Sequence, residues 1–318
     1  MKNNVDIHAD DYALTINTSK ELLDLMKEGL LDSISIIANM SCFDECVNML
    51  YEAIPSLPFL PLISVHLNFV EGKSLSLDDG LLAKNGMMSL SWADVFFSSF
   101  TLKRKVLKEE LKKEMKAQID KVDIVVKKSI EIAKANNIPY KQEKIRIDSH
   151  QHIHSLPLVW NSLMETIKDN NYKVEYIRNP KEPFWVFASK TGLWKTYRPV
   201  NFIKNILLNF FSYQEDKYCD SHNLNKMYMW GLVMSGKMDI DRIKELYPNM
   251  LNKANKDNRT LEILFHPGYT LNDEVNNELA KDAVIDFYNN ENRKIENIAV
   301  RNIRDINIWR KRELLYFF

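Results

Sequence analysis

The sequence predicts an α/β fold in which short β-strands alternate with amphipathic helices along one domain. Seven short runs of apolar and β-branched residues are separated by helical patterns, an alternation that is typical of βα units and a largely parallel sheet. No internal repeat and no linker rich in proline, glycine or serine divides the 318 residues. We therefore expect a single domain over residues 1–318, built as a distorted, seven-stranded (βα) barrel.

The first half of the chain carries three of the predicted strands. A capping box of Thr18 and Glu21 predicts a helix that begins near Thr18. Apolar residues at helical spacing predict a long helix with one buried face and a charged, solvated outer face. The predicted elements are strands 5–7, 33–38 and 62–68, a helix from Thr18, a helix 43–53 and the long helix 103–135.

The second half supplies four more strands and an insertion. Ser155 is a candidate N-cap, and Pro157 suits the first turn of the helix that follows. Residues 180–225 are rich in aromatic side chains and lack clear periodicity, so we expect an insertion over one end of the barrel. Its aromatic residues could stack on a sugar, pack within the insertion or form a dimer contact. The predicted elements are strands 144–148, 173–177, 227–233 and 261–265 and helices 157–168 and 239–254.

Charge and glycine content exclude two classes of partner. Basic and acidic residues both total 43, so the formal charge is zero, whereas a nucleic-acid-binding surface needs excess lysine and arginine. The 8 glycines form no phosphate-binding loop.

No apolar run is long enough to span a membrane, and no signal-peptide pattern is present. Since Cys42, Cys46 and Cys219 lack CxxC spacing, we expect free thiols in a cytoplasmic protein.

Polar clusters lie on or directly after five of the predicted strands. Six of the seven histidines belong to these clusters, and only His222 falls outside them. In a (βα) barrel the carboxyl ends of the strands converge on one rim, where active sites are built. The sequence therefore predicts an active site at that rim. The clusters are residues 8–11, 64–68, 148–154, 178–179 and 266–268.

Two adjacent carboxylates begin this predicted site. Asp10 and Asp11 repel each other when both are ionised, and a divalent cation bound to one removes that cost and leaves the other as a base. The alternative is that one of them caps the following helix.

Histidines are the other candidate ligands. His66 lies on a strand, where a core histidine is the alternative to a metal ligand. His150, His152 and His154 alternate at period two, so an extended backbone would direct all three to one face. Asp148 is placed to orient a neighbouring imidazole. One carboxylate and two imidazoles form a three-ligand site suited to metal-assisted hydrolysis.

Four of these clusters together resemble the YdjC/ChbG carbohydrate deacetylases. The matching motifs are DDY at 10–12, HLNFVEG at 66–72, DSHQHIH at 148–154 and HPG at 266–268, in the family's order. The resemblance implies a barrel related to the polysaccharide deacetylases. It also implies removal of an acetyl group from an N-acetylated amino sugar with one divalent metal ion, magnesium or zinc.

The resemblance assigns roles to four residues. Asp11, His66 and His150 are the implied metal ligands, and Asp10 is the implied catalytic base. The family usually has glycine where this chain has Ala13.

Other residues of the clusters complete the expected site. His266 is our candidate for the proton donor to the leaving amine, with His152 or His154 as substitutes. Gly268 is expected to be a turn residue. The remaining candidates, which would contact the metal ligands or the substrate, are His8, where the family often has asparagine, Asn68, Asp148, His152, His154 and Arg178.

Two other functions stay open at this point. A phosphoesterase would need cations near the metal, and only Arg178 is an evident candidate in the sequence. A barrel that merely binds glycans would be expected to have lost part of the ligand set, whereas all the implied ligands are present. We expect neutral N-acetylated sugars to be preferred over phosphorylated ones.

Overall fold

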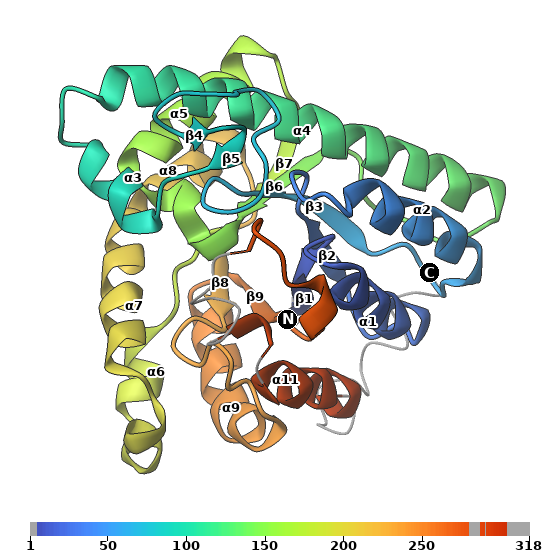
Figure 1. The fold of residues 1–318 in the computed structure, drawn as a ribbon. Coiled ribbons are helices and arrows are strands. Elements are labelled where there is room, and N and C mark those ends of the chain that lie inside the picture. Colours follow the sequence, from blue (N-terminus) through green and yellow to red (C-terminus); the bar gives the residue numbers. More distant parts are fainter. Residues whose placement is uncertain (1–4, 280–286, 290, 304–318) are drawn as a thin grey trace.

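The computed structural model describes residues 5–279, 287–289 and 291–303 and has the predicted α/β architecture (Figure 1). Its main sheet contains β1 (Val5–Tyr12), β2 (Ser33–Ile36), β3 (Leu62–Leu67), β6 (Ile145–Ser149), β7 (Val174–Ile177), β8 (Met227–Trp230) and β9 (Thr260–Phe265). The strand order is β7-β6-β3-β2-β1-β9-β8, and each adjacent pair is parallel.

This order is that of a curled sheet that nearly closes into a barrel. Consecutive strands of the main sheet lie side by side except for β7 and β8, which form its two edges. The amide of Met229 in β8 donates a hydrogen bond of 3.0 Å to the carbonyl of Lys181, just beyond β7. The predicted distorted, seven-stranded barrel is therefore confirmed, with its open seam between β7 and β8.

Helices cover the outside of the sheet, as amphipathic βα crossovers require (Figure 1). The longest, α4, buries the predicted apolar stripe that includes Leu107, Leu111 and Met115. Two polar residues of α4, Glu114 and Gln118, are buried as well, so its charged residues are not all on a solvated face. The covering helices are α1 (Ile16–Lys27), α2 (Phe43–Ala53), α4 (Arg104–Ala135), α5 (Pro157–Asp169), α9 (Ile240–Lys256) and α11 (Glu291–Asn302).

Two predicted helix caps are wrong. Thr15 is the N-cap of α1, and its hydroxyl accepts a hydrogen bond of 3.2 Å from the Thr18 amide. Thr18 therefore lies inside the helix. Leu156 takes the N-cap position of α5 without a side-chain bond, so Ser155 is not the cap, although Pro157 does occupy the first turn.

The segment 180–225 is more ordered than its sequence suggested. It forms α6 (Phe184–Ala188), α7 (Pro199–Phe211) and α8 (Tyr213–His222), and it connects β7 to β8 across the open seam. Apolar residues on more than one side of α7 hide its helical period in the sequence. A second excursion, after β3, forms the small hairpin β4 (Ala83–Lys84) and β5 (Met87–Met88) and then α3 (Trp92–Ser98).

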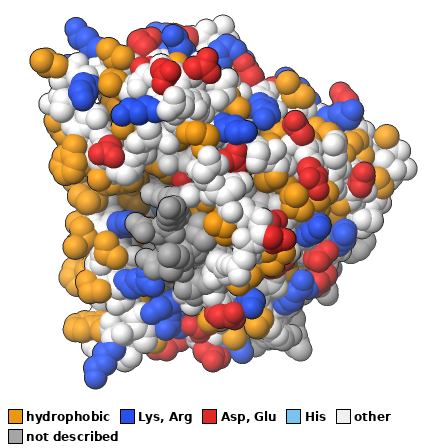
Figure 2. Space-filling model, in the orientation of Figure 1, with side chains coloured by type: hydrophobic (Ala, Val, Ile, Leu, Met, Phe, Trp, Pro, Cys, Tyr) orange, Lys and Arg blue, Asp and Glu red, His pale blue; other side chains and the backbone are white. Residues whose placement is uncertain are grey.

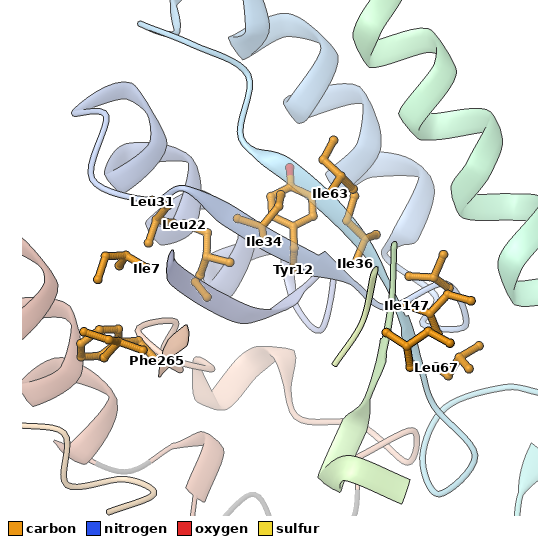
Figure 3. Close-up of a cluster of buried hydrophobic side chains, with 14 of the residues drawn as sticks. Ile7, Tyr12, Leu22, Leu31, Ile34, Ile36, Ile63, Leu67, Ile147 and Phe265 are labelled. Carbon is orange, nitrogen blue, oxygen red and sulfur yellow. The ribbon is translucent and has the colours of Figure 1, made fainter. Parts of the chain in front are cut away.

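Strands and helices share one large apolar core. Figure 3 shows part of it, where Ile7 of β1, Ile34 of β2, Ile63 of β3 and Leu22 of α1 belong to the same buried cluster. Within the described part of the chain, no helix combines the length and the hydrophobicity that crossing a bilayer requires. Cys42, Cys46 and Cys219 are free thiols, as predicted.

Candidate active site

A β-bulge in β1 turns its two adjacent carboxylates toward the same rim. Ala9 pairs with Ile34 and Tyr12 pairs with Ile36, so Asp10 and Asp11 together face a single residue of β2. Asp11 adopts a left-handed backbone with φ of 71°, which aspartate tolerates better than most residues. The cluster thus lies within the strand, whereas the sequence predicted that it follows the strand.

Ala13 continues this irregular stretch with φ of 66°. A left-handed conformation costs an alanine about 1–2 kcal/mol, whereas glycine adopts it freely. This explains why a glycine would be favoured at the position that Ala13 occupies.

Asp11, His66 and His150 converge at the rim as the sequence predicted. Asp11 Oδ1 lies 3.2 Å from His150 Nδ1 and 3.7 Å from His66 Nε2, and all three side chains are buried. One ligand atom from each residue lies within 4.8 Å of the others, a spacing that could hold a metal ion.

Hydrogen bonds on the far side of each imidazole fix which nitrogen faces this cluster. His66 Nδ1 lies 2.7 Å from Asp148 Oδ1, which can only accept, so the proton belongs on Nδ1 and the lone pair on Nε2. Tyr288 donates its hydroxyl proton to Glu71 at 2.6 Å and therefore accepts from His150 Nε2 at 2.8 Å. The lone pair of His150 Nδ1 then faces Asp11. Metal-binding histidines are commonly oriented by such outer partners.

This arrangement fits a divalent cation. Asp11 Oδ1 is buried and has no hydrogen-bond partner, and two imidazole lone pairs point toward it. Three acceptors that face one another repel unless a cation or a proton lies between them. Burial alone would lower the pKa of His66, but the carboxylates of Asp10 and Asp148 outweigh that effect and raise it. The cluster therefore attracts positive charge.

Asp10 is held beside this cluster by Arg178. The two terminal guanidinium nitrogens of Arg178 donate to the two Asp10 oxygens, each at 2.9 Å. Burial opposes ionisation of Asp10, but Arg178, His66 and His8 hold the pKa of its carboxyl well below the usual range. Asp10 is therefore a fixed carboxylate rather than a neutral acid.

Arg178 is paired with buried carboxylates inside the protein. Besides Asp10, it lies 3.2 Å from Asp148 Oδ2 and donates from Nε to Glu262 Oε1 at 2.7 Å, and its side chain is completely buried. Arg178 is thus a structural counter-ion to three carboxylates, and it is not available to a substrate phosphate.

His8 occupies the barrel interior. Its Nδ1 lies 2.7 Å from the Ser33 hydroxyl and its Nε2 lies 2.6 Å from the Ser35 hydroxyl, with Asp10 Oδ1 at 3.1 Å. His8 also belongs to two further groups of acidic residues and histidine that are spaced closely enough for a metal. Because both of its nitrogens already have hydroxyl partners, we consider the Asp11 cluster the better metal site.

The predicted extended run of three histidines is wrong. β6 ends at Ser149, and His150–Ser155 forms a 3-10 segment in which Gln151 and His152 have positive φ. The three rings therefore do not share one face: His150 and His152 line the cavity, whereas His154 does not. His154 Nε2 donates to the carbonyl of Arg178 at 2.8 Å, and burial lowers its pKa to about 4, so it supports the neighbouring strand end and does not reach the cluster.

Asn68 shapes the loop that carries Glu71. Its side-chain oxygen accepts from the amides of Val70 and Glu71, each at 3.2 Å, and its amide group donates to the Glu71 carbonyl at 3.0 Å. Gln118 of α4 binds both backbone polar groups of Asn68. Asn68 thus positions Glu71, which in turn holds Tyr288 against His150.

His266 directly follows β9 and lies near Asp10. Its Nε2 lies 3.9 Å from Asp10 Oδ2 and its Nδ1 lies 3.7 Å from Glu296 Oε2, so the ring stands between two carboxylates. Gly268 has a packing role rather than the predicted turn role: a Cβ there would lie 2.2 Å from the Thr18 side chain.

Sequence comparison adds the family to this geometry. The model of the YdjC-like protein family matches residues 4–125 and 146–317 of the chain. The chain belongs to the YdjC-like family. Its fold is also similar to the crystal structure of an Enterococcus faecalis protein provisionally named a cellobiose-phosphate cleavage protein. That likeness has a TM-score of 0.54 at 16% identity and covers 95% of this chain and 94% of the other.

Four of the five polar clusters of this YdjC-like chain, all but 178–179, contribute to the wall of a cavity of about 290 Å³. A larger cavity, of about 530 Å³, lies at the opposite, amino-terminal ends of the strands, away from these residues. We assign the chemistry to the smaller cavity because the convergent titratable groups lie there. The sequence-predicted residues in its wall are Asp10, His66, His150, His152 and His266.

Two cations in this cavity wall were missed in the sequence. Arg198 and Lys204 reach it from α7, together with Trp92 from α3. Arg198 and Lys204 lie in the segment 180–225, where the sequence showed no pattern that singled out individual residues. They give the cavity a positive charge that Arg178 does not supply.

Several buried partners of the site were missed as well. Glu71 lies inside the 66–72 motif, and Glu262 interrupts an otherwise apolar strand, so both carried a signal. Tyr288 and Arg293 carried none, because they come from the C-terminal region and reach the site only through the fold. Arg293 lies 3.0 Å from Asp11 Oδ2 and holds the oxygen that faces away from the histidines.

Proposed function

We propose that the protein is a metal-dependent hydrolase that removes the acetyl group from an N-acetylated amino sugar. The observation that carries the proposal is the cluster of Asp11, His66 and His150 beside a carboxylate, Asp10, that Arg178 keeps ionised. Membership of the YdjC-like family supports the same reaction, since the resemblance described above implies carbohydrate deacetylation.

Asp11, His66 and His150 would hold one divalent cation, magnesium or zinc. Such a cation supplies the positive charge that acidifies a water molecule and polarises the acetamide carbonyl. The protein fixes the ligand atoms beforehand: Asp148 orients His66, Tyr288 orients His150, and no ligand ring has to turn.

Asp10 accepts the proton from the attacking water. A carboxylate with a depressed pKa is a weak base, so this step depends on a water that is already acidified. Arg178 holds both Asp10 oxygens in place, and His8 approaches one of them.

His266 donates a proton to the leaving amine. It lines the cavity, and its Nε2 lies 3.9 Å from Asp10 Oδ2. His152 also lines the cavity, but burial and the nearby Arg178 hold its pKa well below the usual value, so it is a poor proton donor near neutral pH. His154 is turned away toward Arg178.

The acetyl-sugar function is better supported than the two alternatives. Arg178, the cation that the sequence offered to a phosphoesterase, is paired with Asp10, Asp148 and Glu262. Arg198 and Lys204 still place positive charge in the cavity wall, so family membership is what favours the acetyl sugar over a phosphate ester. A glycan-binding barrel would have no need for the oriented imidazoles. Arg198 and Lys204 could bind an anionic substituent of the sugar, because both line the cavity. Their presence argues against the expected preference for neutral sugars.

Acetate release tests the proposal. Purified protein is incubated with neutral and phosphorylated N-acetylated mono- and oligosaccharides, with and without a chelator. We expect acetate from at least one sugar, loss of release with chelator and recovery on adding magnesium or zinc. Release of phosphate instead of acetate, or acetate release that resists chelation, would contradict the proposed reaction.

A further inference from the structure

One face of the molecule carries a large apolar surface beside the mouth of the catalytic cavity. We call it the α3–α7 face; it comprises Phe97, Phe100, Leu102, Val106, Val200, Ile203, Ile206, Phe210 and Tyr213. Each of these residues is more than half exposed. Figure 2 shows hydrophobic side chains along the edge of the molecule where Figure 1 places α7, with lysine and arginine side chains next to them.

The two helices of this face are neighbours. The rings of Phe96 in α3 and Phe211 in α7 lie 6.1 Å apart, and Trp92 of α3 shares the cavity wall with Val200 of α7. Along α7, Val200, Ile203, Ile206 and Phe210 follow helical spacing and form one exposed stripe. The face is therefore continuous from one helix to the other.

The exposed apolar area of this face is large for a monomeric protein. Four of its side chains are aromatic and about two-thirds exposed, and aromatic residues present about 150–250 Å² each. These rings alone expose roughly 400–700 Å², which reaches the size of the largest patch on a typical monomer before the aliphatic residues are added. A surface of this size marks an interaction site.

The charges around the face are mostly basic, although α3 itself carries Asp94 and Glu109 lies one helical turn after Lys105. Residues 95–106 contain Lys103, Arg104 and Lys105 and no acidic residue, and residues 183–214 contain four basic residues and no acidic one. Among the described residues, Lys195, Arg198 and Lys204 make no ion pair with a carboxylate, and neither do the three basic residues at 103–105. This excess is local, because the whole chain has 43 basic and 43 acidic residues.

We infer that the α3–α7 face docks on an anionic lipid bilayer. Aromatic and aliphatic side chains flanked by lysine and arginine suit the boundary between lipid headgroups and acyl chains. A second copy of this chain fits less well, because a two-fold interface places two copies of this mostly basic patch in one contact. The catalytic cavity opens beside this face, so, on the proposed function, a docked molecule would take its sugar at the membrane surface.

Vesicle flotation tests the docking. The full-length protein is mixed with phosphatidylcholine vesicles that do or do not contain phosphatidylglycerol. We expect binding to the anionic vesicles only, and weaker binding as salt is raised. Exchanging Lys103 and Lys105 for alanine should weaken binding by about fivefold for each lysine removed.

Two apolar substitutions supply the sharper comparison. Ile203→Asp together with Phe210→Asp should weaken vesicle binding by at least about tenfold. Ile124→Asp is the matched control, because Ile124 is an equally exposed isoleucine, 65% against 59% for Ile203, on α4 away from the face. None of these residues lines the cavity, so acetate release from a soluble sugar should be unchanged and reports correct folding.

The possible results separate the two proposals. Absent binding to anionic vesicles, or binding that Ile203→Asp with Phe210→Asp leaves intact, would overturn the docking inference. So would a dimer in sedimentation that the same two substitutions dissociate, since the face would then be a subunit interface. Vesicle binding without acetate release from any sugar would refute the proposed function and leave the docking in place.

Discussion

Replacing Arg178 with methionine should remove a large part of the protein's stability. Arg178 is completely buried and is the counter-ion of Asp10, Asp148 and Glu262, each within 3.2 Å. Removing one partner of a buried ion pair costs about 3–5 kcal/mol, because the other partner stays buried and unpaired. Against a typical free energy of unfolding of about 5–15 kcal/mol, that loss is severe.

The loss should depend on pH in a defined direction. In the wild type, burial opposes ionisation of Asp10, but Arg178 and the nearby histidines together outweigh it and keep the pKa low. Burial is the largest influence on the Asp10 pKa and Arg178 is the largest one that opposes it, so we expect removal of Arg178 to raise the folded-state pKa above the unfolded value of about 3.9. A raised carboxyl pKa destabilises the folded state at neutral pH, and that penalty fades as the pH falls toward about 4. The deficit of the variant should therefore shrink on acidification.

Urea unfolding followed by circular dichroism measures this effect. Wild type and Arg178→Met are compared near neutral pH and at about pH 5, with a chelator present so that no metal contributes. Arg301→Met is the control, because Arg301 pairs with Glu28 on the surface and should cost less than about 1 kcal/mol. An Arg178→Met deficit below about 1 kcal/mol, or one of equal size at both pH values, would refute this account of the buried charges.

Three further substitutions test separate contacts. His150→Ala should abolish binding of one divalent ion in calorimetric titration; unchanged binding would remove His150 from the ligand set. Tyr288→Phe deletes the hydroxyl that orients His150 and should weaken metal affinity by about 10–100-fold, and an unaltered affinity would argue against this role. Gly268→Ala places a Cβ against Thr18 and should cost about 1–3 kcal/mol in urea unfolding, whereas a neutral result would show that α1 yields easily.

The sequence was sufficient to predict the barrel and the residues that meet at its rim. Five of the seven predicted strands carry or precede a polar cluster, and these clusters meet at one rim of a parallel barrel because the carboxyl ends of its strands converge. The shared rim followed from the strand positions, whereas the choice of Asp11, His66 and His150 as the ligands came from the family resemblance. Errors of a few residues in helix starts, such as at Thr18, left the shared rim intact.

Local backbone geometry was the first feature of the site that the sequence could not predict. A period-two pattern at His150, His152 and His154 suggested an extended chain, but two consecutive residues with positive φ separate the rings. The bulge that turns Asp10 and Asp11 to the same rim was equally invisible, because pairing register depends on the neighbouring strand. In both places the functional side chains depend on irregular backbone that alternation rules do not describe.

Pairing between side chains that are distant in the sequence was the second feature that could not be predicted. Arg178 looked like a cation available to a substrate, but three carboxylates from β1, β6 and β9 surround it. Tyr288 orients a histidine that lies 138 positions away in the sequence. Such partners are set by the closure of the sheet and by the helices packed on it, which a single sequence does not reveal.

Asp10→Asn tests the central claim most directly. The substitution keeps the shape of the side chain and leaves Asp11, His66 and His150 unchanged, but it removes the carboxylate that accepts the proton and one of the two oxygens that Arg178 binds. Acetate release is measured on wild type and variant that contain equal amounts of bound divalent metal. The account predicts that the variant retains the metal and loses at least about 100-fold in acetate release. Wild-type rates from the metal-loaded variant would contradict it.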